Sequence, residues 1–239
     1  MQAKDRIIFP LDLPTADEAL RFVRLLKDHV GVFKIGLELF VAVGPAIVEA
    51  VKKEAPDAGI FLDMKFHDIP ETVKRAQMAA SELGVEFITV HLDGGWEMLD
   101  VAAVWAGSAK VLGVTVLTST GAQELAAAGL RTELCEPEKL VMHRAALAKK
   151  NGLAGIVCSG LEAAKVKEEF SDELIIVTPG IRLAAGDVTG DDQKRIVTPA
   201  KAIRSGADYI VIGRPIRDAA DPAEVAAGIA LEIEEAKTK

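Results

Sequence analysis

Several features that define other classes of protein are scarce in this chain of 239 residues. It has only two cysteines, Cys135 and Cys158, and they lack metal-type spacing, so a disulfide framework is not expected and a reducing cytoplasm fits best. Its four histidines form no HxxxH or HxH pair and give no zinc signal. No apolar stretch approaches the roughly 18 residues that span a bilayer, so we expect no membrane segment.

An excess of basic residues is also lacking. The formal net charge is -8, which argues against broad nucleic-acid binding, although a local cluster of Lys and Arg could hold one phosphorylated small molecule. The opening residues, MQAKDRIIFPLDLP, fit neither a signal peptide nor a transit peptide. No Pro- or Ser-rich linker divides the chain, and we expect one domain over residues 1–239.

What the sequence does contain is a repeated pattern of short apolar runs and Ala- and Glu-rich stretches of helical period. Near-continuous Val, Ile and Leu in the runs indicates strands buried on both faces, as in parallel sheets covered by helices. Eight such units predict a single (β/α)8 TIM barrel, with an open doubly wound sheet as the alternative. The expected strands are residues 6–13, 32–39, 59–66, 86–92, 110–117, 155–159, 174–180 and 209–215.

Charged residues fall where these strands end. Alternation in GIFLDMKF sends Asp63 and Lys65 to one face, near the carboxyl end of the strand, which is the end that carries the active site of such barrels. Taken singly, each charge could belong to a structural ion pair or a capped loop. Asp68 in DIPE also fits an N-cap, because Pro70 and Glu71 follow it. Polar residues at equivalent places in other strands are Asp12, Lys34, His91 and Thr118.

A phosphate site is predicted after the last two strands. The final strand ends in IGRP, where Gly213 allows close backbone approach and Arg214 offers a planar fork. Arg182 and Gln193 lie in an unusually long loop, LAAGDVTGDDQKRIV with its flanks, at about 182–197. Loops of this length are functional lids or solvated excursions, and we interpret this one as a lid that grips phosphate.

These motifs carry a family resemblance. FLDMKFHDIPETV resembles the DxKxxDIPxTV signature of the orotidine 5'-phosphate decarboxylase family. The similarity covers essentially the whole chain in order, through six further motifs: LDLP at Leu11, FKIGLELF at Phe33, VTVLTS at Val114, TPGIR at Thr178, DDQKR at Asp191 and IGRPI at Ile212.

The resemblance implies decarboxylation of orotidine 5'-phosphate to uridine 5'-phosphate in pyrimidine nucleotide biosynthesis, without metal or organic cofactor. Lys65 matches the residue that protonates C6 of the pyrimidine, and Lys34, Asp63 and Asp68 match the rest of its charged network. The resemblance also implies a homodimer in which Asp68 reaches the neighbouring subunit's site. The implied substrate-binding residues are Asp12 for ribose, Thr118 for the pyrimidine, Arg182, Gln193, Gly213 and Arg214 for phosphate, and Ile69 and Thr72 from across the interface.

The chain departs from the family pattern at one position, and two rival functions are also compatible with parts of the sequence. In HLDGG the family more often has small neutral residues where this chain has Asp93, which adds a negative charge near the rim. Metal-dependent sugar-phosphate lyases resembling hexulose-phosphate synthase also carry DxKxxD, but they tend to present an acid at the position of Lys34. A non-catalytic nucleotide-binding barrel is the other alternative, although such a protein would have no need to keep every charge of the network.

Overall fold

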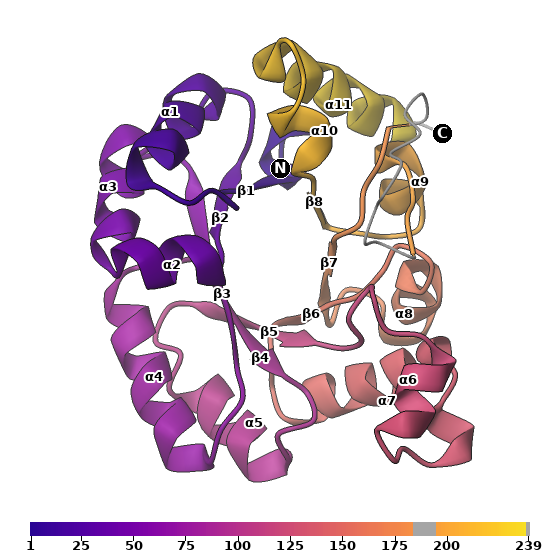
Figure 1. Ribbon diagram of the computed structural model, residues 1–239. Coiled ribbons are helices and arrows are strands. Elements are labelled where there is room, and N and C mark those ends of the chain that lie inside the picture. The colour runs from indigo at the N-terminus through magenta and orange to yellow at the C-terminus, as the bar shows by residue number, and fades with distance from the viewer. Residues whose placement is uncertain (184–194, 238–239) are drawn as a thin grey trace.

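The computed structural model describes residues 1–183 and 195–237 and forms a closed parallel barrel (Figure 1). The eight strands pair in chain order, and β8 pairs with β1 to close the ring. The prediction of a (β/α)8 barrel is confirmed, and the open sheet is ruled out because no strand is left at an edge. The strands are β1 (Ile7–Pro10), β2 (Val32–Ile35), β3 (Gly59–Phe66), β4 (Phe87–His91), β5 (Lys110–Val114), β6 (Gly155–Val157), β7 (Ile175–Thr178) and β8 (Tyr209–Val211).

The helices form an outer layer around the strands (Figure 1). None of the helices within the described residues is long and apolar enough to cross a bilayer. They are α1 (Ala16–Leu26), α2 (Leu37–Val43), α3 (Ala46–Glu54), α4 (Pro70–Glu82), α5 (Trp96–Val104), α6 (Ala122–Ala127), α7 (Pro137–Lys150), α8 (Ala163–Phe170), α9 (Pro199–Arg204), α10 (Arg214–Arg217) and α11 (Pro222–Lys237), with the short 3-10 helices η1 (Lys4–Arg6) and η2 (Thr132–Leu134).

The interior of the barrel is a packed core. Alternate strand residues point outward to the helices, where they join the larger apolar cluster, or inward, where they form a second cluster. Phe61 and Phe87 meet edge to face in this inner cluster, with ring centroids 5.9 Å apart. The inner cluster, which forms a floor beneath the strand ends, contains Ile8, Val32, Phe61, Phe87, Leu112 and Val177.

Several strands end earlier than the sequence predicts. β1 stops at Pro10, so Asp12 lies in the following loop, although Leu11 still donates a backbone hydrogen bond to the Lys34 carbonyl. The residues 37–39 that we expected to extend the second strand instead open α2, directly after Gly36. A short apolar run after a strand can continue the strand or begin a helix that packs on the barrel. The spacing of the apolar residues alone does not distinguish these two structures.

The two flanks of the predicted lid lie side by side. Arg182 donates its backbone N–H to Val197, and Val197 donates to Gly180, at N to O distances of 3.0 and 3.3 Å. Residues 184–194, which include most of the predicted lid and Gln193, lie outside the described residues. The lid therefore stays a prediction, and so does the expectation that residues 1–239 form a single domain.

Candidate active site

Two adjoining cavities lie where the strands end. The cationic cavity has a volume of about 410 Å³ and is lined by Pro10, Asp12, Lys34, Pro179, Gly180, Arg182, Val211, Gly213, Arg214 and Arg217. The apolar cavity has a volume of about 280 Å³ and is lined by Lys34, Phe61, Asp63, Lys65, Val114, Val116, Leu117, Thr118, Ser119, Val157, Cys158, Pro179 and Val211. Lys34, Pro179 and Val211 line both, so the two cavities share a wall.

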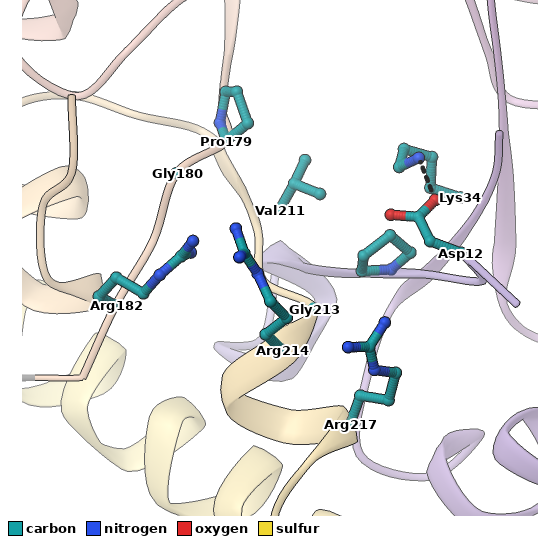
Figure 2. Close-up of a pocket in the computed structure, with 10 residues that line it drawn as sticks. Asp12, Lys34, Pro179, Gly180, Arg182, Val211, Gly213, Arg214 and Arg217 are labelled. Atoms are coloured by element: carbon teal, nitrogen blue, oxygen red, sulfur yellow. Dashed lines mark hydrogen bonds and ion pairs between the residues drawn. The ribbon is translucent and has the colours of Figure 1, made fainter. Parts of the chain in front are cut away.

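A row of alternating charges runs along this shared region. Lys34 Nζ lies 3.0 Å from Asp12 Oδ1 and 3.5 Å from Asp63 Oδ2, and Lys65 Nζ lies 2.8 Å from Asp63 Oδ2. Figure 2 shows the contact between Lys34 and Asp12 at the edge of the cationic cavity. Lys34 and Asp63 are buried, whereas Lys65 is half-buried and reaches the apolar cavity. The charges that the sequence assigns to β1, β2 and β3 thus meet in one place.

The row keeps Lys34 and Asp63 ionised. Burial alone would lower the pKa of Lys34, but Asp63 and Asp12 outweigh it, and the pKa is raised above its ordinary value. Burial would likewise raise the pKa of Asp63, yet Lys34, Lys65 and the Thr89 hydroxyl lower it. Because the folded-state pKa of Asp63 is depressed, its contribution to stability is present above the ordinary aspartate pKa and is lost as the pH falls through the folded-state value.

An irregularity in β3 brings Lys65 to this position. The register with β4 passes from Leu62 opposite Ile88 to Phe66 opposite Val90, so β3 holds two extra residues over this interval. Lys65 has a φ of 52°, in the left-handed region that non-glycine residues rarely adopt. Strand alternation correctly predicts that Asp63 and Lys65 lie together. The cause is different, however, because a bulge between the two residues, and not a regular strand, brings the side chains together.

Thr89 holds this bulge and was missed by the sequence reasoning. Its hydroxyl donates to Asp63 Oδ1 at 2.9 Å and accepts the backbone N–H of Lys65 at 2.9 Å. The residue is fully buried in β4. The only sequence signal for it is a hydroxyl within the apolar run FITVH, opposite the strand that carries the charges.

We expect Thr89→Val to lower turnover by roughly ten-fold, because a loosened Asp63 no longer aims Lys65. It also leaves the Lys65 N–H without its partner and lowers the free energy of unfolding by about 1–3 kcal/mol. Initial rates and urea unfolding measure the two effects. Thr89→Ser is the matched control, because it keeps the hydroxyl and should retain most of the activity. Equal rates for the valine and serine variants would contradict the assigned contact.

Asp68, Ile69 and Thr72 are exposed, and none of them lines either cavity. Within the described residues no ion pair joins Asp68 to Lys65. The predicted N-cap is wrong in detail: α4 begins at Pro70 with Ile69 at the cap position, and Asp68 accepts the backbone N–H of Ile69 at 2.7 Å. The helix begins one residue late because Asp68 bonds the adjacent N–H rather than one inside the helix. Ile69 is 68% exposed.

Arginines surround the cationic cavity. Figure 2 shows Arg182, Arg214 and Arg217 reaching it from the chain after β7 and from α10. Gly213 is needed for packing, because a Cβ there would lie 2.7 Å from Pro10 Cγ. The sequence reasoning missed Arg217, which also pairs with Asp218 at 2.7 Å. The only sequence signal for Arg217 was that a basic residue lies about one helical turn after Gly213 and Arg214.

The charge of Asp93 is neutralised locally. Asp93 lies 3.5 Å from His91 Nδ1 and 3.3 Å from Arg144 Nη2, and Arg144 also donates to the Thr115 carbonyl. Burial lowers the pKa of His91 more than Asp93 raises it. The ring of His67 lies 5.7 Å from that of His91. The departure at Asp93 therefore ties the end of β4 to the segment after β5 through Arg144 of α7.

The described residues contain no group of three His, Cys, Asp or Glu side chains placed to hold a metal ion. Cys135 and Cys158 are both free thiols, and Cys158 is buried in the wall of the apolar cavity.

Fold and site together define a (β/α)8 barrel enzyme with its polar site at the carboxyl ends of the strands. The family model of the orotidine 5'-phosphate decarboxylase / HUMPS family matches residues 5–229, and the chain belongs to this family. The resemblance inferred from the motifs is thereby confirmed.

Individual relatives agree. The chain is 53% identical to an orotidine 5'-phosphate decarboxylase of Desulfosudis oleivorans, over 98% of this chain and 94% of the relative. It is 43% identical to one of Geotalea daltonii, over 97% of each. The crystal structure of orotidine 5'-phosphate decarboxylase from Lactobacillus acidophilus superposes with a TM-score of 0.82 at 33% identity, covering 96% of this chain and 99% of that one.

Proposed function

We propose that this protein decarboxylates orotidine 5'-phosphate to uridine 5'-phosphate, in pyrimidine nucleotide biosynthesis and in the cytoplasm. The observation that carries the proposal is the row Asp12–Lys34–Asp63–Lys65, which ends with an amine in an apolar cavity beside an arginine-lined one. Family membership supports it, together with relatives named for this activity. The apolar cavity suits the base of a nucleotide, and the arginine-lined cavity suits its phosphate.

The chemistry requires stabilisation of a carbanion. Loss of CO2 from C6 leaves charge in the plane of the ring, where no adjacent π system absorbs it. The Lys65 ammonium, held by Asp63, is a preorganised positive charge at that carbon and then the acid that protonates it. Because Asp63 fixes the amine before the reaction, little reorganisation is needed as the charge develops.

Repulsion between Asp63 and the substrate carboxylate adds a smaller effect. Two such charges 4 Å apart repel by about 4 kcal/mol at an effective dielectric near 20, and the repulsion disappears as CO2 leaves. Enzymes typically lower barriers by about 8–23 kcal/mol, so this effect alone is insufficient. Stabilisation of the developing anion is therefore the larger contribution to the lowering of the barrier.

The remaining contacts place the nucleotide. Arg182, Gly213 and Arg214 bind the phosphate, Asp12 the ribose and Thr118 the pyrimidine edge, from the walls of the two cavities. Phosphate binding, remote from C6, supplies energy that orders the reacting centre. Gln193, assigned to the phosphate by the resemblance, lies outside the described residues.

The active assembly is a homodimer in which Asp68, Ile69 and Thr72 enter the partner's site. Their exposure, and the lack of an ion pair between Asp68 and Lys65 among the described residues, support this assignment.

The deciding experiment follows the ultraviolet absorbance of orotidine 5'-phosphate with purified protein in EDTA. We expect the substrate band to disappear with time at a rate that EDTA does not change, because Lys34, packed between two carboxylates, occupies the place where a metal-binding acid would stand. Loss of the rate in EDTA would show that the reaction needs a metal ion and would contradict the proposed metal-free mechanism. Binding of uridine 5'-phosphate without any turnover of substrate would favour the non-catalytic barrel.

Arg217 tests the phosphate assignment. We expect Arg217→Gln to raise KM for orotidine 5'-phosphate by roughly ten-fold, equivalent to ~1.4 kcal/mol, and to leave kcat within about two-fold, because a cation beside the phosphate contributes to binding and not to the chemical step. Steady-state kinetics measure both. Arg21→Gln is the control, because Arg21 packs over the Phe22 ring outside the cationic cavity. An unchanged KM in Arg217→Gln would remove Arg217 from the phosphate site.

A further inference from the structure

A buried ion pair lies beside the two cavities without lining either. Arg195 Nη1 is 2.8 Å from Glu162 Oε1, and the two residues are 9% and 4% exposed. Burial raises the pKa of Glu162, against the opposing effect of the Arg195 guanidinium. Glu162 Oε2 and Arg195 Nε have no hydrogen-bond partner among the described residues. Since a buried pair of this kind is often replaceable by apolar residues without loss of stability, its position calls for another explanation.

The pair connects the ends of β5 and β6. Arg195 Nη2 donates to the carbonyl of Val116 at 3.4 Å, and Val116 lines the apolar cavity two residues before Thr118. Glu162 lies in the segment between β6 and α8, and Cys158 of the same segment lines that cavity as well. Arg195 thus holds the wall of the cavity that is proposed to receive the base.

The backbone after Arg195 connects to the end of β7. Val197 exchanges hydrogen bonds with Gly180 and Arg182, which line the cationic cavity. The Val197 side chain packs on Gly160, where an added Cβ would lie 2.4 Å from Val197 Cγ2. Residues 195–197 therefore join the wall of the apolar cavity to the wall of the cationic cavity.

We propose that the Glu162–Arg195 pair is a positioning element that fixes the spacing between the base wall and the phosphate wall, so that a bound phosphate places the reacting carbon at Lys65. The inference rests on the proposed function. A displacement of about 1 Å at a reacting centre lowers rates by roughly 100-fold, so a rigid spacer between the walls has a large effect on turnover. Neither residue touches the nucleotide.

The test separates positioning from stability. Glu162→Gln and Arg195→Met each leave one buried group without its charged partner, and both lower the thermal midpoint. The double variant Glu162→Leu/Arg195→Met replaces the pair by apolar side chains, and its midpoint returns to within about 3 °C of the original protein. Its kcat/KM for orotidine 5'-phosphate stays at least ~10-fold low, because leucine and methionine do not bond the Val116 carbonyl.

Binding measurements give a readout independent of turnover. In the double variant the dissociation constant of uridine 5'-phosphate, which spans both walls, rises by roughly ten-fold, whereas that of inorganic phosphate, which uses one wall, changes by less than about two-fold. Lys165→Met is the matched control, because it removes the exposed pair between Lys165 and Glu138, which joins α8 to α7, and it alters neither constant.

Recovery of kcat/KM and nucleotide affinity along with the thermal midpoint would overturn the proposal and leave the pair a purely structural role. If the double variant does not fold, Arg195→Lys tests the proposal instead. A lysine can pair with Glu162 but lacks the second guanidinium nitrogen that donates to the Val116 carbonyl. Nucleotide affinity within two-fold of the original in that variant would equally overturn it. Failure of the proposed function is seen separately, as unmodified protein that binds uridine 5'-phosphate and leaves orotidine 5'-phosphate intact.

Discussion

Replacing Lys65 by alanine will lower kcat for orotidine 5'-phosphate by about 10⁵-fold, because one change removes both the charge that stabilises the C6 carbanion and the acid that protonates it. Uridine 5'-phosphate, which has no carboxylate at C6, should bind within about three-fold of its original affinity, since the arginines of the cationic cavity are unchanged. Single-turnover absorbance measurements and titration with the product measure the two quantities.

The conservative variant sharpens this result. Lys65→Arg keeps a positive charge near Asp63 but cannot readily release a proton, so it should bind the nucleotide as Lys65→Ala does and recover only a small part of the turnover. Substantial turnover in Lys65→Ala, with binding intact, would remove Lys65 from the reaction. A fall in product affinity that parallels the fall in kcat would instead indicate damage to the cavity.

Mixing two inactive proteins should restore activity. If Asp68 completes the partner's site, a heterodimer of Lys65→Ala and Asp68→Ala chains holds one intact site, formed by Lys65 of one chain and Asp68 of the other. Random exchange between two-fold symmetric dimers then yields about one quarter of the original number of sites. The rise from a negligible rate is measured after exchange has been verified with subunits of two distinguishable masses.

The mixture of Lys65→Ala with Asp63→Ala is the matched control. Asp63 and Lys65 are 2.8 Å apart within one chain, so no arrangement of these two variants assembles a complete row. This mixture should stay inactive. Recovery in neither mixture, after full exchange, would show that each chain holds a complete site and that Asp68 has no role across an interface.

The sequence was a good guide to the barrel and to most of the charged row. Eight apolar runs predict the strands because parallel strands buried on both faces leave a strong local pattern. Lys34, Asp63 and Lys65 could be assigned to one site because parallel strands bring equivalent positions to one rim. Strand ends were less predictable, since residues 37–39 are as apolar as a strand and yet form the first turn of α2.

What the sequence could not provide depends on contacts between distant residues. Thr89 looks like any strand threonine until the bulge in β3 places Asp63 against its hydroxyl. The Asp93 carboxylate looks disruptive until Arg144, on α7, is seen to pair with it. Glu162 and Arg195 are 33 residues apart, and neither belongs to a pattern that predicts burial.

The left-handed backbone at Lys65 has a consequence for heat resistance. An L-residue in that region carries a conformational cost of about 1–2 kcal/mol, which glycine largely avoids. Lys65→Gly should accordingly melt at a higher temperature than Lys65→Ala, although both lack the amine. The backbone conformation that aims the amine therefore has a cost of its own, separate from the ion pair that the amine makes with Asp63.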